Sequence, residues 1–159
     1  MSIKAGDRLP EATLQRIRDG VENVDTRALF DNRKVVIFAV PGAFTPTCSE
    51  KHLPGFVEHF DAFRDKGVDV ACVSVNDPFV MQAWAESQHV PEGMMVLADG
   101  NGDFTRALGL EMDASAYGMG MRSKRYAIYA EDGVVREVLV EAPGEFRVSS
   151  AEYVLPRLP

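Results

Sequence analysis

The pattern of apolar and polar positions predicts strands that alternate with helices. Residues 34–40 (KVVIFAV) are almost wholly apolar and β-branched, which is typical of a strand buried on both faces of a parallel sheet. Residues 68–75 (VDVACVSV) repeat this pattern. Between them, apolar residues recur at helical spacing from Phe56 to Phe63, and Gly67 supplies a stop signal. The three elements predict a βαβ unit with a right-handed crossover.

Shorter elements follow this unit. Asn76 or Asp77 can cap a second helix that has Pro78 in its first turn. The pattern then predicts an end of this helix near residue 88, a short strand at 94–98, a turn at 99–102, and a short helix ending near Gly109.

The pattern changes in the C-terminal third. Residues 125–130 and 134–140 alternate as strands do, and residues 131–133 (EDG) between them indicate a tight hairpin turn. A last helix is expected to start at Ser149, which has the spacing of a capping box with Glu152. The order of elements predicts an α/β fold with a mixed central sheet flanked by helices.

Composition is consistent with one globular domain covering residues 1–159. The chain has 46% hydrophobic and 26% charged residues and a net charge of −7, with its basic residues scattered. We therefore expect no nucleic-acid partner. The first ten residues lack the blocks of a signal peptide, and no apolar run approaches the roughly 20 residues of a membrane span. These features predict no membrane association and a reducing, cytoplasmic location.

The two cysteines are expected to be free thiols. Cys48 and Cys72 lie 24 residues apart and form no Cys-x-x-Cys pair, and a chain of 159 residues needs no disulfide for stability. The three histidines show no recognisable ligand spacing. We therefore expect neither a structural zinc site nor a cofactor.

The segment from Pro41 to Cys48 (PGAFTPTC) carries the most chemical information, because it lies where a parallel strand gives way to its helix. Thr45 can act as the N-cap and Pro46 suits the first helical position, which places Cys48 in the first turn. Unpaired amides and the helix dipole there favour the negatively charged thiolate. A thiolate is the form that attacks an electrophilic peroxide oxygen.

Such an attack also needs donors that stabilise charge on the leaving oxygen. The Thr45 hydroxyl could donate to the thiolate or to the bound peroxide. Arg125 is the candidate guanidinium, because it opens a predicted strand next to a loop rich in glycine and methionine at residues 112–121.

Pro-x-x-x-Thr-x-x-Cys, here Pro41, Thr45 and Cys48, resembles the active-site signature of the peroxiredoxins. Three longer segments resemble the type II subfamily, whose plant and bacterial members use glutathione or glutaredoxin: VPGAFTPTCSEKHLPGF (40–56), SVNDPFVMQAW (74–84) and RSKRYA (122–127). The resemblance covers nearly the whole chain and implies a thioredoxin-like fold.

The resemblance implies a role for each residue of the signature. Cys48 would be the peroxidatic cysteine, with Thr45 and Arg125 as polar partners. Pro41 would shield a substrate pocket that also includes Gly42 and Thr47. The chain would be an antioxidant thiol peroxidase that reduces hydrogen peroxide and alkyl hydroperoxides, is reduced by glutathione, glutaredoxin or thioredoxin, and forms a homodimer through loops near the active site.

One departure concerns the cysteine that resolves the sulfenic acid. Some relatives have a resolving cysteine where Ser149 stands, and others have a second cysteine at the position of Cys72. A disulfide needs Cα atoms within about 7 Å, which a cysteine inside a strand is not expected to meet without local unfolding. The simpler hypothesis is that an external thiol attacks the Cys48 sulfenic acid.

Several alternatives stay open at this stage. Cys72 is also a possible second redox cysteine, or simply a buried apolar residue. Glu50 and His52 could tune Cys48, or do nothing catalytic. Pro54 should kink or bulge the helix and so help its first turn to unwind. The rival functions are a disulfide reductase, weakened by the lack of a Cys-x-x-Cys pair, and a redox sensor or holdase.

Overall fold

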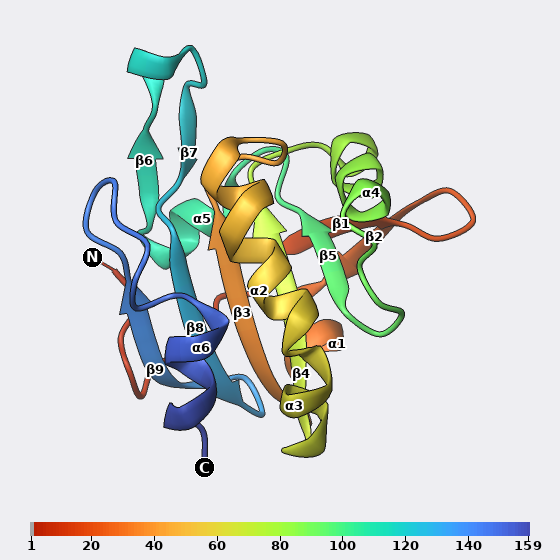
Figure 1. Ribbon diagram of the computed structural model, residues 1–159, viewed down its shortest axis with the longest axis vertical. Coiled ribbons are helices and arrows are strands. Elements are labelled where there is room, and N and C mark those ends of the chain that lie inside the picture. Colours follow the sequence, from red (N-terminus) through yellow and green to blue (C-terminus); the bar gives the residue numbers. More distant parts are fainter. Residues whose placement is uncertain (1) are drawn as a thin grey trace.

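A computed structural model describes residues 2–159, and its centre is a mixed sheet of seven strands in the order β2-β1-β5-β4-β3-β8-β9 (Figure 1). The strands of this sheet are β1 (Thr13–Ile17), β2 (Val21–Asp25), β3 (Lys34–Val40), β4 (Val68–Ser74), β5 (Met95–Ala98), β8 (Tyr126–Glu131) and β9 (Val134–Val140). Strands β3, β4 and β5 are parallel, while β8 runs antiparallel to β3. The predicted α/β class, with a mixed sheet flanked by helices, is confirmed.

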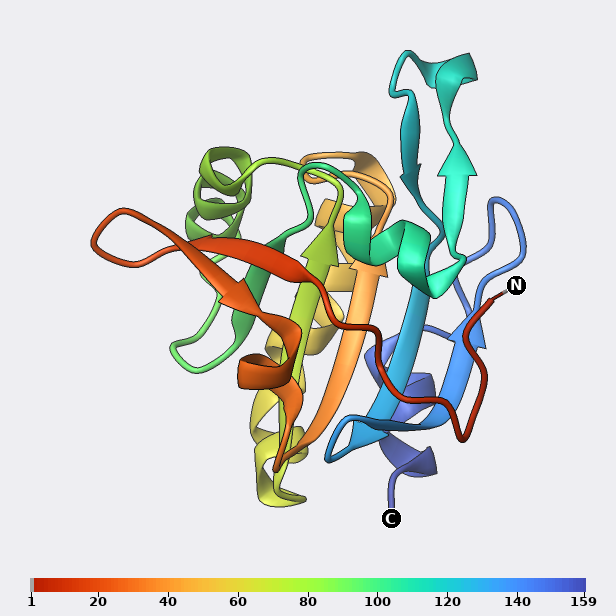
Figure 2. The same cartoon turned by 180° about the vertical axis from the view of Figure 1, so that it is seen from behind.

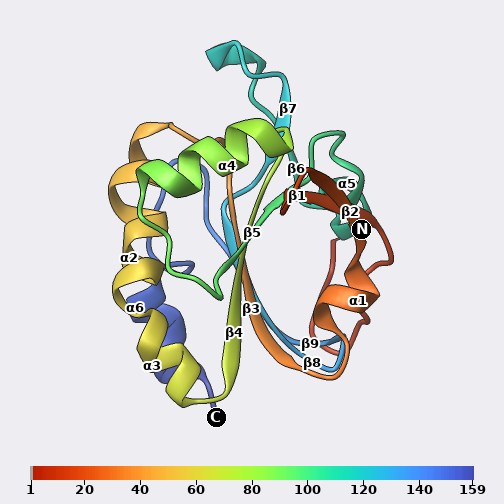
Figure 3. The ribbon, with the colours of Figure 1, turned by 90° about the vertical axis from the view of Figure 1, so that its right-hand side faces the viewer.

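Helices cover both faces of this sheet (Figure 3). Helices α2 (Leu53–Glu58), α3 (Phe60–Asp65) and α6 (Ala151–Val154) lie on one face, and α1 (Thr26–Phe30) and α5 (Asp103–Leu108) lie on the other. Helix α4 (Pro78–Ser87) crosses one end. Short helical turns are the π-helical η1 (Cys48–His52) and the 3-10 turns η2 (Ser115–Tyr117) and η3 (Leu155–Arg157). No helix in residues 2–159 is long and apolar enough to span a bilayer.

Two apolar layers hold the helices to the sheet. Residues Val36 and Phe38 of β3 face Phe56 and Phe63 of the α2–α3 layer. The alternate residues of β3 face the opposite layer, which contains Phe104 of α5. Because strand side chains alternate between faces, the wholly apolar pattern of residues 34–40 reflects burial on both sides. The prediction for this strand is confirmed to the residue.

Two hairpins were not predicted. Strands β1 and β2 pair antiparallel up to Ile17 and Val21, and the three residues between them, 18–20, form the hairpin loop (Figure 2). Asp19 and Gly20 in this loop both have positive φ, which tight hairpin connections commonly need. Strands β6 (Glu111–Asp113) and β7 (Met121–Ser123) form a separate two-stranded sheet that projects from the molecule. Residues 112–121 were expected to form a loop, because three-residue strands leave little periodicity.

The helix after Cys48 differs from the single helix that the sequence predicted. After two α-helical residues, 46 and 47, it passes through a π-helical turn in which the Leu53 amide donates to the Cys48 carbonyl, and it breaks at His59. Pro54 has no N–H to donate, so a widened turn beside it is physically reasonable. The predicted bulge near Pro54 is confirmed.

The predicted start of the last helix is wrong by one residue. Ser150, not Ser149, caps α6, and its hydroxyl accepts from the Tyr153 amide at 3.1 Å. The Ser149 hydroxyl instead donates to the carboxylate of Glu141 at 2.6 Å. The Ser149 hydroxyl therefore bonds to a buried carboxylate outside the helix, and not to the Glu152 amide as the predicted capping box required.

Candidate active site

The end of β3 leads directly into the segment that carries Cys48. The chain leaves the sheet at Pro41, Phe44 takes a positive φ of 66°, and helical backbone begins at Pro46. Pro46 thus occupies the predicted first helical position. Cys48 is the third helical residue, so it lies in the first turn as predicted, and it is fully buried.

Arg125 reaches Cys48 across 77 residues of sequence. It immediately precedes β8, which pairs with β3, so adjacent strands bring the two residues to the same end of the sheet. The Arg125 Nη2 atom donates to the Cys48 Sγ at 3.1 Å. A guanidinium at this distance can stabilise negative charge on an atom beside it.

His52 holds the other end of the guanidinium. Its Nδ1 lies 2.9 Å from Arg125 Nη1, and its Nε2 lies 2.9 Å from the Ser149 carbonyl oxygen. Because arginine only donates, Nδ1 is the acceptor and Nε2 carries the hydrogen. Burial and the Arg125 charge lower the pKa of His52 to about 3, against a smaller opposing contribution from Ser149. The ring is therefore neutral at physiological pH.

Thr45 is close to the site but is not a side-chain cap. Its hydroxyl donates to the Gly42 carbonyl at 2.6 Å, and its carbonyl accepts from the Ser49 amide at 2.9 Å. Thr45 thus occupies the predicted N-cap position directly before Pro46, but its hydroxyl donates to Gly42 and caps no helix amide. The Thr45 hydroxyl therefore donates to the Gly42 carbonyl and not to the Cys48 sulfur, because the loop turns back on itself between residues 42 and 45.

The three residues expected to form the substrate pocket belong to the segment between β3 and Cys48. Pro41 and Thr47 are half-buried, and Gly42 is buried. A Cβ atom on Gly42 would lie 2.7 Å from the Met119 Cε and 3.2 Å from the Thr45 Cγ2. Glycine at this position lets the β6–β7 arm approach the loop before Cys48.

Cys72 lies in the middle of β4, where it pairs with Phe38 and Val96 of the flanking strands. Both cysteines are free, and Cys72 is fully buried in the same apolar layer as Cys48. Burial, helped by Cys48, raises the pKa of the Cys72 thiol well above its usual value, with Arg125 opposing. Cys72 is thus a protonated thiol without solvent access.

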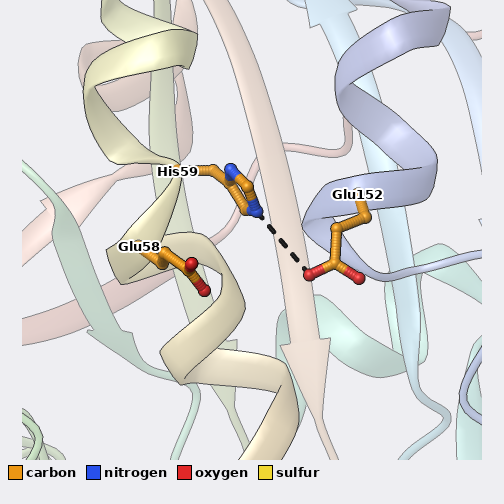
Figure 4. A group of neighbouring side chains, drawn as sticks. All are labelled: Glu58, His59 and Glu152. Carbon is orange, nitrogen blue, oxygen red and sulfur yellow. Dashed lines mark ion pairs between the residues drawn. The ribbon is translucent and has the colours of Figure 1, made fainter.

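One group of potential metal ligands lies away from these residues. The ligand atoms of Glu58, His59 and Glu152 come within 4.8 Å of one another at the junction of α2 and α3 and on α6 (Figure 4). His59 Nε2 lies 3.6 Å from a Glu152 carboxylate oxygen, and Glu58 and Glu152 are exposed. No hydrogen bond among the described residues connects this group to Cys48 or Arg125.

Comparison with known proteins places the chain in a family. A family model described as Redoxin matches residues 4–155. Peroxiredoxin-2E-2, chloroplastic, of Oryza sativa subsp. japonica is 52% identical over 164 residues, which cover 99% of this chain and 73% of that protein. Peroxiredoxin-2B of Arabidopsis thaliana is 44% identical over 98% of each chain. This chain belongs to the peroxiredoxins.

Solved structures support the assignment of this chain to the peroxiredoxins. The crystal structure of reduced Prx3 in complex with H2O2 from Vibrio vulnificus is 51% identical, covers 98% of each chain and superposes with a TM-score of 0.93. The predicted thioredoxin-like fold and the resemblance to type II peroxiredoxins are confirmed. The protein is accordingly an antioxidant oxidoreductase with thiol peroxidase activity.

Cys48 and Arg125 of this peroxiredoxin site were predicted from the sequence, and His52 was predicted only as a residue that could tune Cys48, without a partner. The contact between His52 and Arg125 follows from residue 52 lying four positions after Cys48, on the same side of a helix, although helical spacing cannot identify the partner. Glu141, which holds Ser149, was missed because nothing in its sequence context marks it as buried. Glu50, the other suggested modulator, is exposed.

Proposed function

We propose that the Cys48 thiolate of this peroxiredoxin attacks the terminal oxygen of hydrogen peroxide or an alkyl hydroperoxide. The new S–O bond forms as the O–O bond breaks, so sulfur is oxidised to a sulfenic acid and the peroxide is reduced. The leaving hydroxide or alkoxide takes a proton from solvent and departs as water or an alcohol. Cys48, Thr45 and Arg125 have the catalytic roles in this proposal, and Pro41, Gly42 and Thr47 form the pocket.

The observation that carries the proposal is the 3.1 Å hydrogen bond from Arg125 Nη2 to Cys48 Sγ. The same guanidinium can stabilise the thiolate before the attack and the leaving oxygen during it, because it is fixed before charge develops. The Thr45 hydroxyl, now bonded to Gly42, would turn to the peroxide when substrate displaces that bond.

We further propose that an external thiol returns Cys48 to the reduced state. Thiolates rather than thiols attack sulfenic acids and disulfides, and Cys72 is a buried thiol with a raised pKa. Ser149, at the position of a resolving cysteine in some relatives, has no thiol. Glutathione would attack the sulfenic acid, release water and leave a mixed disulfide, which a second glutathione or glutaredoxin would reduce.

The test combines two cysteine variants with two reducing systems. Stopped-flow fluorescence of the single tryptophan, Trp84, follows oxidation by hydrogen peroxide. Cys48→Ser should abolish the fast phase, whereas Cys72→Ser should keep it and should keep turnover with glutathione and glutaredoxin. Fast oxidation in Cys48→Ser would refute the peroxidatic role. Loss of turnover in Cys72→Ser would instead make Cys72 the resolving cysteine, and turnover with thioredoxin alone would identify a different donor.

We also propose a homodimer. Three large apolar side chains are strongly exposed: Phe44, Phe79 and Tyr117, at 56%, 65% and 83%. They belong to the loop after β3, to α4 and to the β6–β7 arm, which lie at the same end of the molecule (Figures 1 and 3). Exposed aromatic groups of this kind favour a protein contact, which a second copy of the chain would supply.

A reducing compartment such as the cytoplasm would suit this chemistry. Both cysteines are free, and the proposed cycle requires a supply of reduced thiol. Subcellular fractionation with a glutathionylation assay on Cys48 tests this proposal. Recovery of the protein mainly from an oxidising compartment would contradict it.

A further inference from the structure

The loop between β9 and α6 is folded around a buried carboxylate. Glu141 is only 7% exposed, and its Oε2 accepts three hydrogen bonds, from the Arg147 amide, the Ser149 amide and the Ser149 hydroxyl, at 2.6 to 2.8 Å. Burial raises the pKa of this carboxyl, but these hydrogen bonds outweigh burial and lower it overall. The other oxygen, Oε1, is buried without a partner among residues 2–159. An ionised carboxylate is costly to bury, so its placement requires an explanation.

A continuous set of hydrogen bonds leads from this carboxylate to Cys48. Ser149, held by Glu141, presents its carbonyl to His52 at 2.9 Å, and His52 accepts from Arg125 at 2.9 Å. Arg125 then donates to the Cys48 sulfur at 3.1 Å. The Glu141 amide also donates to the Arg125 carbonyl at 2.9 Å. Arg125, Glu141, Ser149 and His52 thus form a closed ring, which restrains the guanidinium from both ends.

Aromatic packing leaves the imidazole little freedom inside this ring. The His52 ring lies between Phe38, Phe56 and Phe146, with centroids 4.9, 5.7 and 5.1 Å away. Phe146 belongs to the loop that Glu141 holds, and its ring centroid also lies 5.9 Å from the Arg125 guanidinium carbon. Displacement of the loop would therefore remove both a hydrogen bond and an apolar wall from the imidazole.

We infer that Glu141 is a positioning residue for peroxide reduction, which acts through Ser149 and His52 to hold the Arg125 guanidinium against Cys48. Glu141 touches neither the sulfur nor the space beside it, so its effect depends on the residues between. The inference rests on the proposed role of Cys48 and Arg125. It goes beyond that role because it places a determinant of the peroxide step on the loop after β9, 16 residues beyond Arg125.

A second buried carboxylate in the same chain provides a matched control. Asp99 is 3% exposed and accepts three hydrogen bonds, from the Phe104 amide, the Thr105 amide and the Thr105 hydroxyl. Its carboxylate anchors the start of α5, and the hydrogen-bond partners of this carboxylate, residues 104 and 105, make no hydrogen bond to Cys48 or Arg125 among the described residues. Asp99→Asn therefore removes an equivalent carboxylate without disturbing Arg125.

The experiment compares Glu141→Gln with Asp99→Asn. Both variants should lower the Tm by a similar amount. Only Glu141→Gln should reduce the second-order rate constant for hydrogen peroxide, by roughly ten- to a hundredfold, since small misplacement of a catalytic group has effects of this size. Alkylation of Cys48 by iodoacetamide at the same pH should fall far less, because alkylation releases iodide and does not need the guanidinium on a leaving oxygen.

Two further variants test the route and guard against a failure to fold. Ser149→Ala removes only the hydroxyl donor and should give a smaller loss of the peroxide rate constant. In a His52→Asn background, Glu141→Gln should cause little additional loss, because both changes interrupt one path. Fully multiplicative losses would overturn the inference, as would a fast Glu141→Gln enzyme. If the wild-type protein itself reacts slowly with peroxide, the proposed function fails instead.

Discussion

At the scale of single residues, Arg125 joins the reactive sulfur to the rest of the network. Its two terminal nitrogens have different partners, Cys48 Sγ at 3.1 Å and His52 Nδ1 at 2.9 Å. A lysine ammonium is a compact point charge and cannot reproduce this planar pair of donors. The geometry of the guanidinium, and not only its charge, is therefore expected to matter.

We predict that Arg125→Lys reduces the rate constant for hydrogen peroxide by on the order of 10²-fold, the usual cost of removing one preorganised donor. Stopped-flow fluorescence of Trp84 measures this constant. Arg136→Lys is the matched control, since Arg136 pairs with Glu131 on the surface and should leave the constant within twofold of wild type. Equal rates in Arg125→Lys and wild type would contradict a geometric role for the guanidinium.

His52 should make the stability of the protein sensitive to acid. Its pKa is about 3 in the folded protein and 6.5 in the reference state, because burial and Arg125 disfavour the imidazolium. Between these values the unfolded chain binds more protons than the folded one, so the free energy of unfolding falls as pH drops through this window. The contribution of the neutral His52 ring to the free energy of unfolding is fully present above about pH 6.5.

We expect His52→Asn to flatten this dependence. Urea unfolding at several pH values from 7 to 4 should give a shallower slope than wild type, with a difference of a few kcal/mol at most across the window. The variant His89→Asn, at an exposed position with positive φ that asparagine tolerates, should keep the wild-type slope. Identical slopes in His52→Asn and wild type would show that acid sensitivity has another source.

At the scale of elements, α4 supports the π-helical turn that carries Cys48. Trp84 is fully buried, and its Nε1 donates to the Ser49 hydroxyl at 2.9 Å. Ser49 directly follows Cys48, so this bond links the second crossover helix to the reactive turn. It also makes the tryptophan a reporter of that turn, which justifies its use in the kinetic tests.

We predict that Ser49→Ala destabilises the protein by about 1–3 kcal/mol, because it leaves a buried indole N–H without an acceptor. Denaturant unfolding measures the change. Ser87→Ala is the control, since the Ser87 hydroxyl donates to the Trp84 carbonyl from an exposed position and its loss should cost at most about 0.5 kcal/mol. Similar losses in the two variants would argue against a supporting role for the Ser49 bond.

At the scale of the whole molecule, the exposed aromatic side chains predict self-association. Phe79 on α4 is 65% exposed, and we expect Phe79→Lys to shift a dimer to monomer by placing a charge in the contact. Sedimentation velocity at micromolar concentration measures the state. Val21→Lys, on the β1–β2 hairpin, is a control with an exposed apolar residue elsewhere. A monomeric wild-type protein would refute the dimer, and a dimeric Phe79→Lys would place its contact on another surface.

Periodicity was sufficient for long elements with strong patterns. Residues 34–40, 68–75 and 134–140 were predicted as strands nearly to the residue, and Asp77 caps α4 as expected. Periodicity failed where elements were short or broken by contacts distant in sequence. The β6–β7 arm and the break at His59 are examples, because a few residues carry too little pattern to outweigh local alternatives.

The sequence by itself determined the chemistry of the site. The signature around Cys48, its place between a strand and a helix, and the turn residues Pro41 and Pro46 are local features that backbone preferences fix. Only the tertiary structure decided which distant residues meet. The antiparallel pairing of β8 with β3 carries Arg125 to Cys48, and the loop after β9 places Ser149 beside His52. Such contacts depend on strand order and burial, which no local spacing encodes.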